Sequence, residues 1–371
     1  MRWNWQKADW PKFTWDERKL MRAEAQFAEG IGVIVGASKH LNPEERDVLS
    51  IELMSVEAVD TSAIEGEVMD RDSVQSSIRK HLGLGGDLRR ASPAEAGIAQ
   101  MMVDLFGQVS APLNEETLHR WHQLVTNGRT DIKDIGCYRT HHDPMQIVSG
   151  PIYDPKVHFE APPSGQVEQE MTAFWSWLKR SDPDGDTALP PVTRAGIAHL
   201  WFESIHPYED GNGRVGRAVS EKILAQGFSS SVITGMAGTL LKHRKAYYAA
   251  LENAHQDLEI TDWLVWFASK ALESQQRTLR LVEFTLEKSR LMDRVSSQIN
   301  PRQEKAIMRL FAAGPEGFIG GLSAANYMRI TGAPSATTTR DLAGLVEIGV
   351  LLRRGENKAT RYHLNFTVER P

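Results

Sequence analysis

The spacing of apolar residues predicts a mostly helical protein. Apolar positions recur every three to four residues, the period of an amphipathic α-helix. The helical stretches are 45–59, 113–126, 166–179, 194–205, 214–224 and 247–255. Segment 141–163 differs, because proline and glycine there separate two short β-type pieces, 146–149 and 156–159, around a turn. We therefore expect an all-α fold with one small β-hairpin.

The last part of the chain shows a second arrangement. Three helical stretches precede two strand-like runs, 350–354 and 360–364, which a polar loop joins. The helical stretches are 303–312, 323–331 and 335–348. Three helices followed by a hairpin predict a winged helix-turn-helix domain, with 331–334 as the turn.

Composition narrows the class of protein. The 371 residues exceed one typical core, so several domains are expected. The single cysteine, Cys137, excludes an internal disulfide and a cysteine-rich zinc site, as is typical of a reducing compartment. No run approaches 18 apolar residues, and the polar, aromatic start is unlike a signal peptide. A net charge of −5 gives no general attraction to nucleic acid. We expect a cytoplasmic protein without membrane contact.

The richest chemistry lies between His206 and Arg217. This stretch reads His-Pro-Tyr-Glu-Asp-Gly-Asn-Gly-Arg-Val-Gly-Arg. Gly211, Asn212 and Gly213 permit a sharp turn into a helix, whose free N–H groups and dipole bind anions. The stretch therefore predicts a phosphate site.

Four charged or titratable side chains flank this turn. Arg214 and Arg217 lie three positions apart on one helix face, where two guanidinium groups hold successive phosphates, as a nucleotide requires. Asp210 is a hard oxygen ligand of the kind that binds Mg²⁺ beside phosphates. His206 has the intrinsic pKa of a general base near neutral pH. The alternative is that His206 caps a helix and the arginines are surface charges.

The same stretch resembles the signature of the Fic family of nucleotidyl transferases. That signature runs His, any residue, Phe, any residue, Asp or Glu, Gly-Asn-Gly-Arg, any two residues, Arg. Tyr208 stands at the Phe position, a conservative change in a side chain that anchors the loop. Gly213 stands where the related Doc kinases carry Lys, so the resemblance favours nucleotidyl transfer. It also implies a helical Fic core, with 194–205 as its central buried helix.

The resemblance implies that AMP passes from ATP to a Ser, Thr or Tyr hydroxyl of a target protein, the chain itself included, and that pyrophosphate leaves. His206 would be the general base and Asp210 the Mg²⁺ ligand. The nucleotide-binding residues implied within the motif are Gly211, Asn212, Gly213, Arg214 and Arg217.

A shorter pattern, Thr61 to Gly66, matches the inhibitory motif of many Fic proteins: Ser or Thr, any three residues, Glu, then Gly or Asn. The chain has five Glu-Gly or Glu-Asn pairs, and only Glu65 has Ser or Thr four residues earlier. The resemblance implies an inhibitory helix whose Glu65 pairs with Arg217 in place of the γ-phosphate. The alternative is that Glu65 only caps or solvates a helix end.

The hairpin in 141–163 lies where Fic proteins carry the flap, which pairs with an extended segment of the target through main-chain bonds. Ile147, Val148 and Ser149 would form the target-binding strand; the alternative is an ordinary surface hairpin.

Three further residues fall where Fic proteins wall the adenine pocket: Tyr247, Tyr248 and His255. The two tyrosines fit core positions equally well, and family members often carry Asn at the position of His255. His199, seven residues before His206, is either half of a metal pair or a satisfied core histidine.

These features divide the chain into an N-terminal helical region with the inhibitory helix (1–110), a Fic catalytic core (111–295) and a winged-helix domain (296–371). Over 302–364, nine Lys or Arg stand against five Asp or Glu, so this domain either contacts DNA or serves protein interaction and homodimer formation. The rival hypothesis is a DNA-binding transcription regulator that senses ATP without transfer. The tryptophans within the first fifteen residues either stack on a ligand or pack against the domain.

Overall fold

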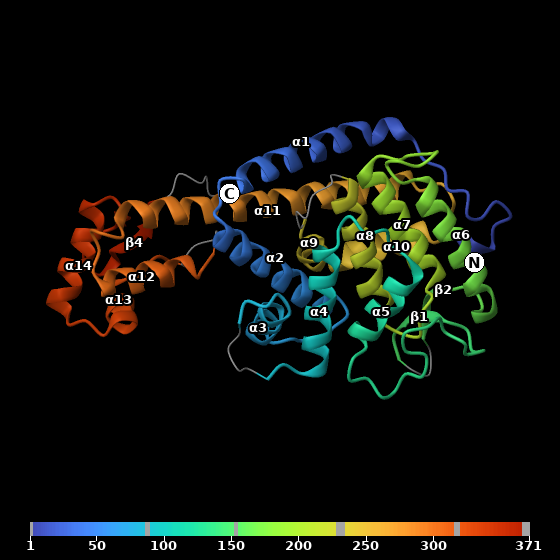
Figure 1. Cartoon of the computed structure of the whole chain (residues 1–371), viewed down its shortest axis with the longest axis horizontal. Coiled ribbons are helices and arrows are strands. Elements are labelled where there is room, and N and C mark those ends of the chain that lie inside the picture. The colour runs from blue at the N-terminus through green and yellow to red at the C-terminus, as the bar shows by residue number, and fades with distance from the viewer. Residues whose placement is uncertain (1–2, 86–89, 152–154, 228–233, 315–319, 366–371) are drawn as a thin grey trace. The chain divides into compact units, whose positions relative to one another are not determined.

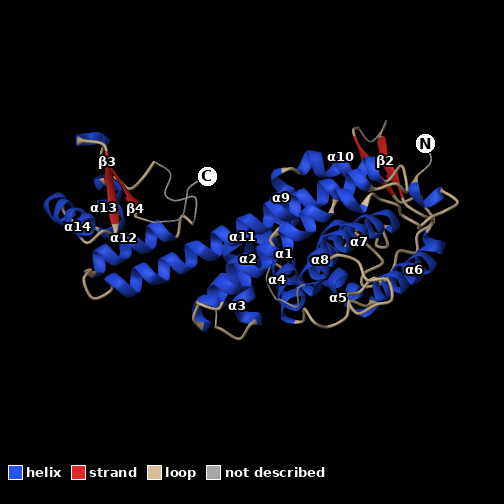
Figure 2. Cartoon of the chain, turned by 90° about the horizontal axis from the view of Figure 1, so that it is seen from above, coloured by secondary structure: helices blue, strands red, loops and turns tan. Residues whose placement is uncertain are grey.

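The computed structural model describes residues 3–85, 90–151, 155–227, 234–314 and 320–365. The chain divides into two compact units, residues 1–35 with 50–278 and residues 36–49 with 279–371. Helices dominate both, and the described strands form two small antiparallel hairpins (Figure 2). This confirms the prediction of an all-α fold with a small β-hairpin.

The first unit is built around α7 (Pro191–Ile205) and α8 (Asn212–Gly227). Every residue from 192 to 205 is buried, because α7 is apolar around most of its circumference and packs against other helices, α8 among them. Figure 1 shows α7 and α8 among the other helices of this unit. The remaining elements with residues in this unit are η1 (Asn4–Gln6), η2 (Glu17–Lys19), α1 (Met21–Ser38), α2 (Pro43–Ile64), α3 (Arg71–His81), α4 (Pro93–Gly107), α5 (Glu115–Val125), η3 (Ser164–Gln166), α6 (Val167–Arg180), α9 (Met236–Lys242), α10 (Arg244–Ala254) and α11 (Thr261–Val295).

Polar side chains fix several helix starts. Ser92 begins α4 in a capping box with Glu95, which satisfies two backbone N–H groups that the helix leaves free. Asn114 begins α5 by accepting a hydrogen bond from the N–H of Thr117. Helix α2 is followed by Gly66 at φ +88°, a left-handed conformation that favours glycine. None of the described helices combines the length and apolar character needed to cross a membrane.

The hairpin of this unit pairs β1 (Gln146–Ser149) with β2 (Lys156–Glu160). Ile147 lies opposite Phe159, and the register shifts between Ile147 and Val148. Phe159 is buried, whereas Val148 is 50% exposed, so one side of the hairpin faces the protein and the other is open.

The second unit contains three helices and a hairpin in the predicted order. They are α12 (Pro301–Phe311), α13 (Ala324–Thr331), α14 (Ser335–Glu347), β3 (Leu351–Arg354), η4 (Asn357–Ala359) and β4 (Arg361–Leu364). The unit has its own apolar core, which includes Phe311, Tyr327 and Leu345. Leu322 adds a bridge to Tyr362 of β4. The winged-helix assignment stays a prediction.

Candidate active site

His206 ends the central helix in an unusual backbone conformation. It caps α7 with φ 50° and ψ 61°, the left-handed region that non-glycine residues rarely adopt. Its N–H still donates to the carbonyl of Phe202, at 2.9 Å. The imidazole is thereby held at the exact end of a rigid, buried helix, where the chain turns into the loop.

Arg139 fixes this turn from the segment before the flap. Its Nε donates to the carbonyl oxygen of His206 at 2.8 Å, and its backbone N–H donates to Pro207 O at 2.9 Å. Burial lowers the pKa of Arg139 to about 10. A buried arginine that donates to main-chain carbonyls locks a loop in one shape. Sequence reasoning missed Arg139, since no periodicity or motif connects it with His206.

Asn212 and Tyr208 set the shape of the loop itself. The Asn212 amide accepts from the Tyr208 N–H at 2.9 Å and donates to the Tyr208 carbonyl at 2.8 Å. The Tyr208 ring is buried and stacks on His122 with 4.1 Å between centroids. Gly211 takes φ +78°, which only glycine adopts readily. The tyrosine in place of the usual Phe therefore still anchors the loop.

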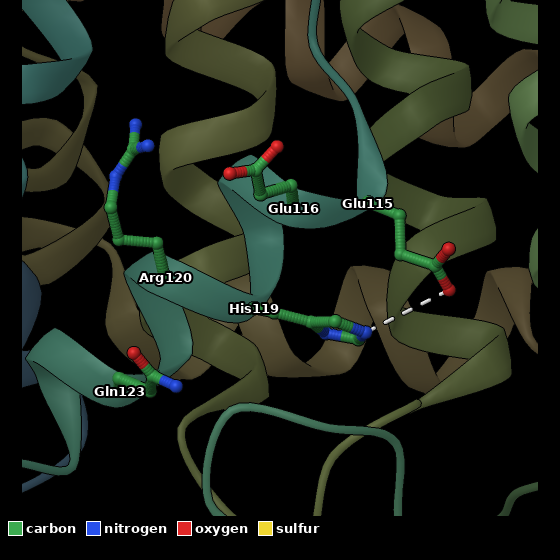
Figure 3. A pocket seen from close by; sticks show the side chains of 5 residues that line it. All are labelled: Glu115, Glu116, His119, Arg120 and Gln123. Atoms are coloured by element: carbon green, nitrogen blue, oxygen red, sulfur yellow. Dashed lines mark ion pairs between the residues drawn. The ribbon is translucent and has the colours of Figure 1, made fainter.

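The hydroxyl of Tyr208 reaches a surface pocket on α5. This oxygen lies 3.1 Å from His119 Nδ1. Figure 3 shows the His119 ring turned toward Glu115, whose Oε1 lies 3.7 Å from Nε2. The pocket is lined by Glu115, Glu116, His119, Arg120 and Gln123. His119 connects this pocket with the loop.

Arg217 is ion-paired with Glu65. The two side chains approach to 2.6 Å, and Arg217 also donates to the hydroxyl and the carbonyl of Thr61, at 2.7 and 2.9 Å. Burial alone would lower the pKa of this 2% exposed arginine, but the charge of Glu65 raises it. A side chain at Gly213 would clash with the Glu65 carboxylate. The carboxylate thus lies directly against the turn.

Arg214 has a carboxylate partner of its own. Its Nη1 lies 2.7 Å from Glu67 and donates to the carbonyl of Val125 at 3.1 Å. Glu67 stands two residues after Glu65. The short segment that follows α2 in the sequence therefore supplies a carboxylate partner to both arginines of the motif. Sequence reasoning missed Glu67, because the inhibitory pattern ends at Gly66.

Asp210 lies at the exposed side of the loop. Its side chain is 43% exposed, and Oδ2 is 2.6 Å from Arg129 Nη1. Burial would raise the pKa of Asp210, but the Gly211 N–H and the Arg129 guanidinium outweigh it and hold the pKa below its ordinary value. An ionised, accessible carboxylate beside an anion-binding turn fits a Mg²⁺ ligand. The described residues contain no group of three or more His, Cys, Asp or Glu side chains close enough to hold a metal without a substrate.

The imidazole of His206 is neutral at physiological pH. Burial lowers its pKa to about 4. Its Nδ1 is 3.7 Å from Glu203, too far for a hydrogen bond, and finds no hydrogen-bond partner among the described residues. Burial also raises the pKa of Glu203 to about 8, so this carboxyl is protonated near neutral pH. A neutral imidazole is the form that accepts a proton.

This low pKa predicts the pH dependence of any reaction that uses His206 as a base. Activity falls as pH drops through the pKa of the base, so the loss is expected near pH 4 rather than near 6.5, the value of an exposed histidine. Removal of Glu65 keeps the pKa low, because the Glu65 charge raises it. The check is the rate at which the Glu65→Gly variant attaches label to itself from ATP labelled at the α-phosphate, measured between pH 5 and 8. A rate that is half-maximal at pH 6.5 would contradict the prediction.

The loop from His206 to Arg217 lies in a region that matches a known protein family. Residues 112–224 match the family described as Fic/DOC, which includes the whole stretch from His206 to Arg217. The protein contains a domain of the Fic family. Residues 3–84 match a domain of unknown function, DUF4172. Thr61 and Glu65 therefore lie in this matched region, outside the residues that match Fic/DOC.

Curated relatives of the Fic domain are named protein adenylyltransferases. A probable protein adenylyltransferase of Aquifex aeolicus is 31% identical over 98 residues, which is 26% of this chain and 27% of that protein. The protein adenylyltransferase Fic of Nematostella vectensis is 35% identical over 100 residues, 26% of this chain and 21% of that protein. The matches thus span about a quarter of the length of these relatives.

Solved structures share the fold. A Fic family protein from Desulfovibrio desulfuricans G20 aligns with 97% of this chain and 99% of its own, with a TM-score of 0.55 and 20% identity. A Fic domain containing signaling protein from Bacteroides thetaiotaomicron aligns with 70% of this chain and 97% of its own, with a TM-score of 0.52 and 17% identity. At these identities the likeness concerns the fold alone.

The residues predicted to wall an adenine pocket divide into two kinds. Tyr247 is buried, and its hydroxyl lies 2.7 Å from His199 Nε2, whose other nitrogen is 3.0 Å from Gly216 O. His199 is therefore a satisfied core histidine. His255 is buried as well, whereas Tyr248 is 37% exposed, with its hydroxyl 3.4 Å from Glu65. Of the three predicted residues, Tyr248 is the exposed one.

The flap residues lie on β1. Ile147 is half-buried and lies opposite Phe159, whereas Val148 and Ser149 are exposed. Ser149 Oγ lies 2.6 Å from His158 on the neighbouring strand. Helix α10 holds the hairpin from the side, since His158 and Lys156 lie 3.0 and 3.3 Å from Glu252.

Proposed function

We propose that the chain transfers AMP from ATP to a Ser, Thr or Tyr hydroxyl of a target protein, itself included. The observation that carries this proposal is the imidazole of His206, 12% exposed at the end of α7, on the loop that leads into α8 with its two buried arginines, Arg214 and Arg217. The names of the curated relatives support it. A flap that binds main chain selects little sequence, so the acceptor is defined by its hydroxyl group.

The proposed reaction uses the loop as follows. His206 takes the proton of the acceptor hydroxyl, the oxygen attacks the α-phosphate, and the bond to the β-phosphate breaks so that pyrophosphate leaves. The N–H groups of Gly211, Asn212 and Gly213 at the start of α8 donate to phosphate oxygens, the Gly211 N–H exchanging its present acceptor, Asp210 Oδ1, for one of them. Arg214 and Arg217 neutralise the charge of the leaving pyrophosphate.

Asp210 is the residue we propose for Mg²⁺, together with phosphate oxygens and water. The ion would neutralise phosphate charge when bound. Arg129 forms ion pairs with both Asp210 and Asp131, the latter at 2.6 Å. If Mg²⁺ displaces Arg129 from Asp210, the guanidinium therefore keeps Asp131 as a partner.

We further propose that Glu65 inhibits the reaction. While its carboxylate occupies Arg217, a γ-phosphate cannot, so ATP binds with its α-phosphate out of line with the acceptor. Thr61 assists by accepting two further hydrogen bonds from the same guanidinium. Glu67 would add to the inhibition by holding Arg214.

Incubation with ATP labelled at the α-phosphate tests the proposal. The Glu65→Gly protein is expected to label itself in the presence of Mg²⁺, and mass spectrometry to find an added AMP group. Asp210→Asn removes the charge at nearly the same size and is expected to weaken Mn²⁺ binding, measured by electron paramagnetic resonance, as well as labelling. A protein that binds ATP but never gains label would favour the rival sensor hypothesis.

A second proposal concerns the C-terminal unit, in which DNA contact is favoured by exposed arginines on α14 and β3. Arg340 lies in α14, and Arg353 and Arg354 lie in β3. Lys358 follows in η4, and its side chain lies outside the described residues.

The full chain is expected to bind duplex DNA with an affinity that falls steeply with salt. Replacing Arg353 and Arg354 by alanine should lower the slope of log K against log salt by roughly 2, because each phosphate contact contributes about 0.9. The absence of binding at low salt in a filter or anisotropy assay would favour the protein-interaction alternative.

A further inference from the structure

The flap is too small to hold its own shape. A two-stranded hairpin of this size is marginally stable at best in water and needs a surface to pack on. Here part of that surface comes from the first residues of the chain. Trp3, Phe159 and Ala161 form one buried apolar cluster, against which Trp5, Met145 and Ile147 pack.

Two tryptophans hold β2 directly. Trp3 meets the Phe159 ring edge to face, with 5.4 Å between centroids. The Trp5 indole N–H donates to the carbonyl of Glu160 at 2.6 Å. Because Phe159 is the cross-strand partner of Ile147, Trp3 supports the hairpin at the position of a residue predicted to bind the target.

The same segment is tied to the helix that carries His206. Asn4 is fully buried, and its amide donates to Ser204 Oγ at 2.8 Å, two residues before His206. Its backbone N–H donates to His255 O at 2.7 Å, and the His255 ring stacks on Phe159 with 3.9 Å between centroids. One short segment therefore connects the flap, the end of α7 and the end of α10.

We propose that residues Trp3 to Gln6 are a positioning element of the acceptor site, which sets the distance between the flap and His206. This inference rests on the proposed AMP transfer. An acceptor strand bound to β1 by main-chain bonds moves with β1, so any displacement of the flap displaces the acceptor hydroxyl. A misplacement of 1 Å costs roughly 100-fold in rate.

Trp10 provides a matched control in the same N-terminal region. Its indole N–H donates to Glu170 of α6 at 2.8 Å, and its ring contacts Trp201 at 6.1 Å between centroids. These are the same kinds of contact as those of Trp5 and Trp3, but they lead to the helical core rather than to the flap.

The test compares variants in the full-length Glu65→Gly protein. Trp3→Ala is expected to raise amide exchange of peptides covering 146–149 and 156–160, and to lower kcat of autolabelling by roughly 10- to 100-fold with an unchanged KM for ATP. Trp5→Phe, which removes the indole N–H and keeps an aromatic ring, should act in the same direction. Trp3→Phe should restore protection and rate, and Trp10→Phe should match the parent protein.

Equal flap exchange and equal rates in the Trp3, Trp5 and Trp10 variants would overturn the inference. Should Trp3→Ala fail to fold, Trp5→Phe decides, because it removes the hydrogen bond to Glu160 and keeps an aromatic ring against the cluster. A parent protein that never labels would overturn the proposed function instead, and the exchange comparison would still show whether the segment holds the flap.

Discussion

Replacement of Glu65 by glycine is expected to raise autolabelling by about 100-fold, the range that correct orientation of a reacting group supplies. The carboxylate lies 2.6 Å from the buried Arg217, so its removal leaves that guanidinium to the γ-phosphate. The initial rate with ATP labelled at the α-phosphate measures the effect across ATP and Mg²⁺ concentrations.

Two further variants separate this effect from general loosening. The double variant Glu65→Gly with Arg217→Ala should lose the higher autolabelling rate, because it has no Arg217 guanidinium to hold the γ-phosphate. Glu52 lies in α2, the helix that precedes Glu65, and pairs with Arg71 at the surface, so the Glu52→Gln protein should label as slowly as the native protein. Labelling of Glu65→Gly at the native rate would mean that the motif at Thr61 to Gly66 inhibits nothing.

In the Glu65→Gly background, His206→Ala is expected to lower labelling by roughly 10²- to 10⁴-fold, the usual contribution of a general base. ATP affinity should change little, because the proposed phosphate contacts come from α8 and its two arginines. Labelling rate and calorimetric ATP binding give the two readouts. His142→Ala, an exposed histidine near the flap, serves as control. Undiminished labelling without His206 would refute its role as base.

The sequence predicted the local part of the site and, through the family resemblance, the pairing of Glu65 with Arg217, but not the other long-range partners. The stretch from His206 to Arg217 is contiguous, so residue type and order alone indicate a helix end, a turn and an anion-binding helix start. Arg139 and Glu67 reach the loop from 67 and 147 residues away, and no periodicity reports such contacts. The buried tyrosine Tyr247 shows the converse limit, since an aromatic residue at helical spacing fits a pocket wall and a core equally well.

The fold shows the same division. Helices with a clear apolar face, such as α5 and α6, were predicted nearly to the residue. Helix α4 was missed, although Ser92 and Glu95 form a capping box that is readable three residues apart. The 35-residue helix α11 was missed although its buried residues Trp263, Leu264, Phe267 and Ala268 recur at helical spacing.

The left-handed backbone of His206 has a consequence for stability as well as for chemistry. An L-residue at φ 50° costs on the order of 1 kcal/mol relative to glycine, so the loop stores strain that its hydrogen bonds to Arg139 must hold. Alanine at 206 keeps that strain and loses the imidazole, whereas glycine loses both. We therefore expect the glycine variant to unfold at a higher denaturant concentration than the alanine variant, because glycine takes this backbone conformation without strain.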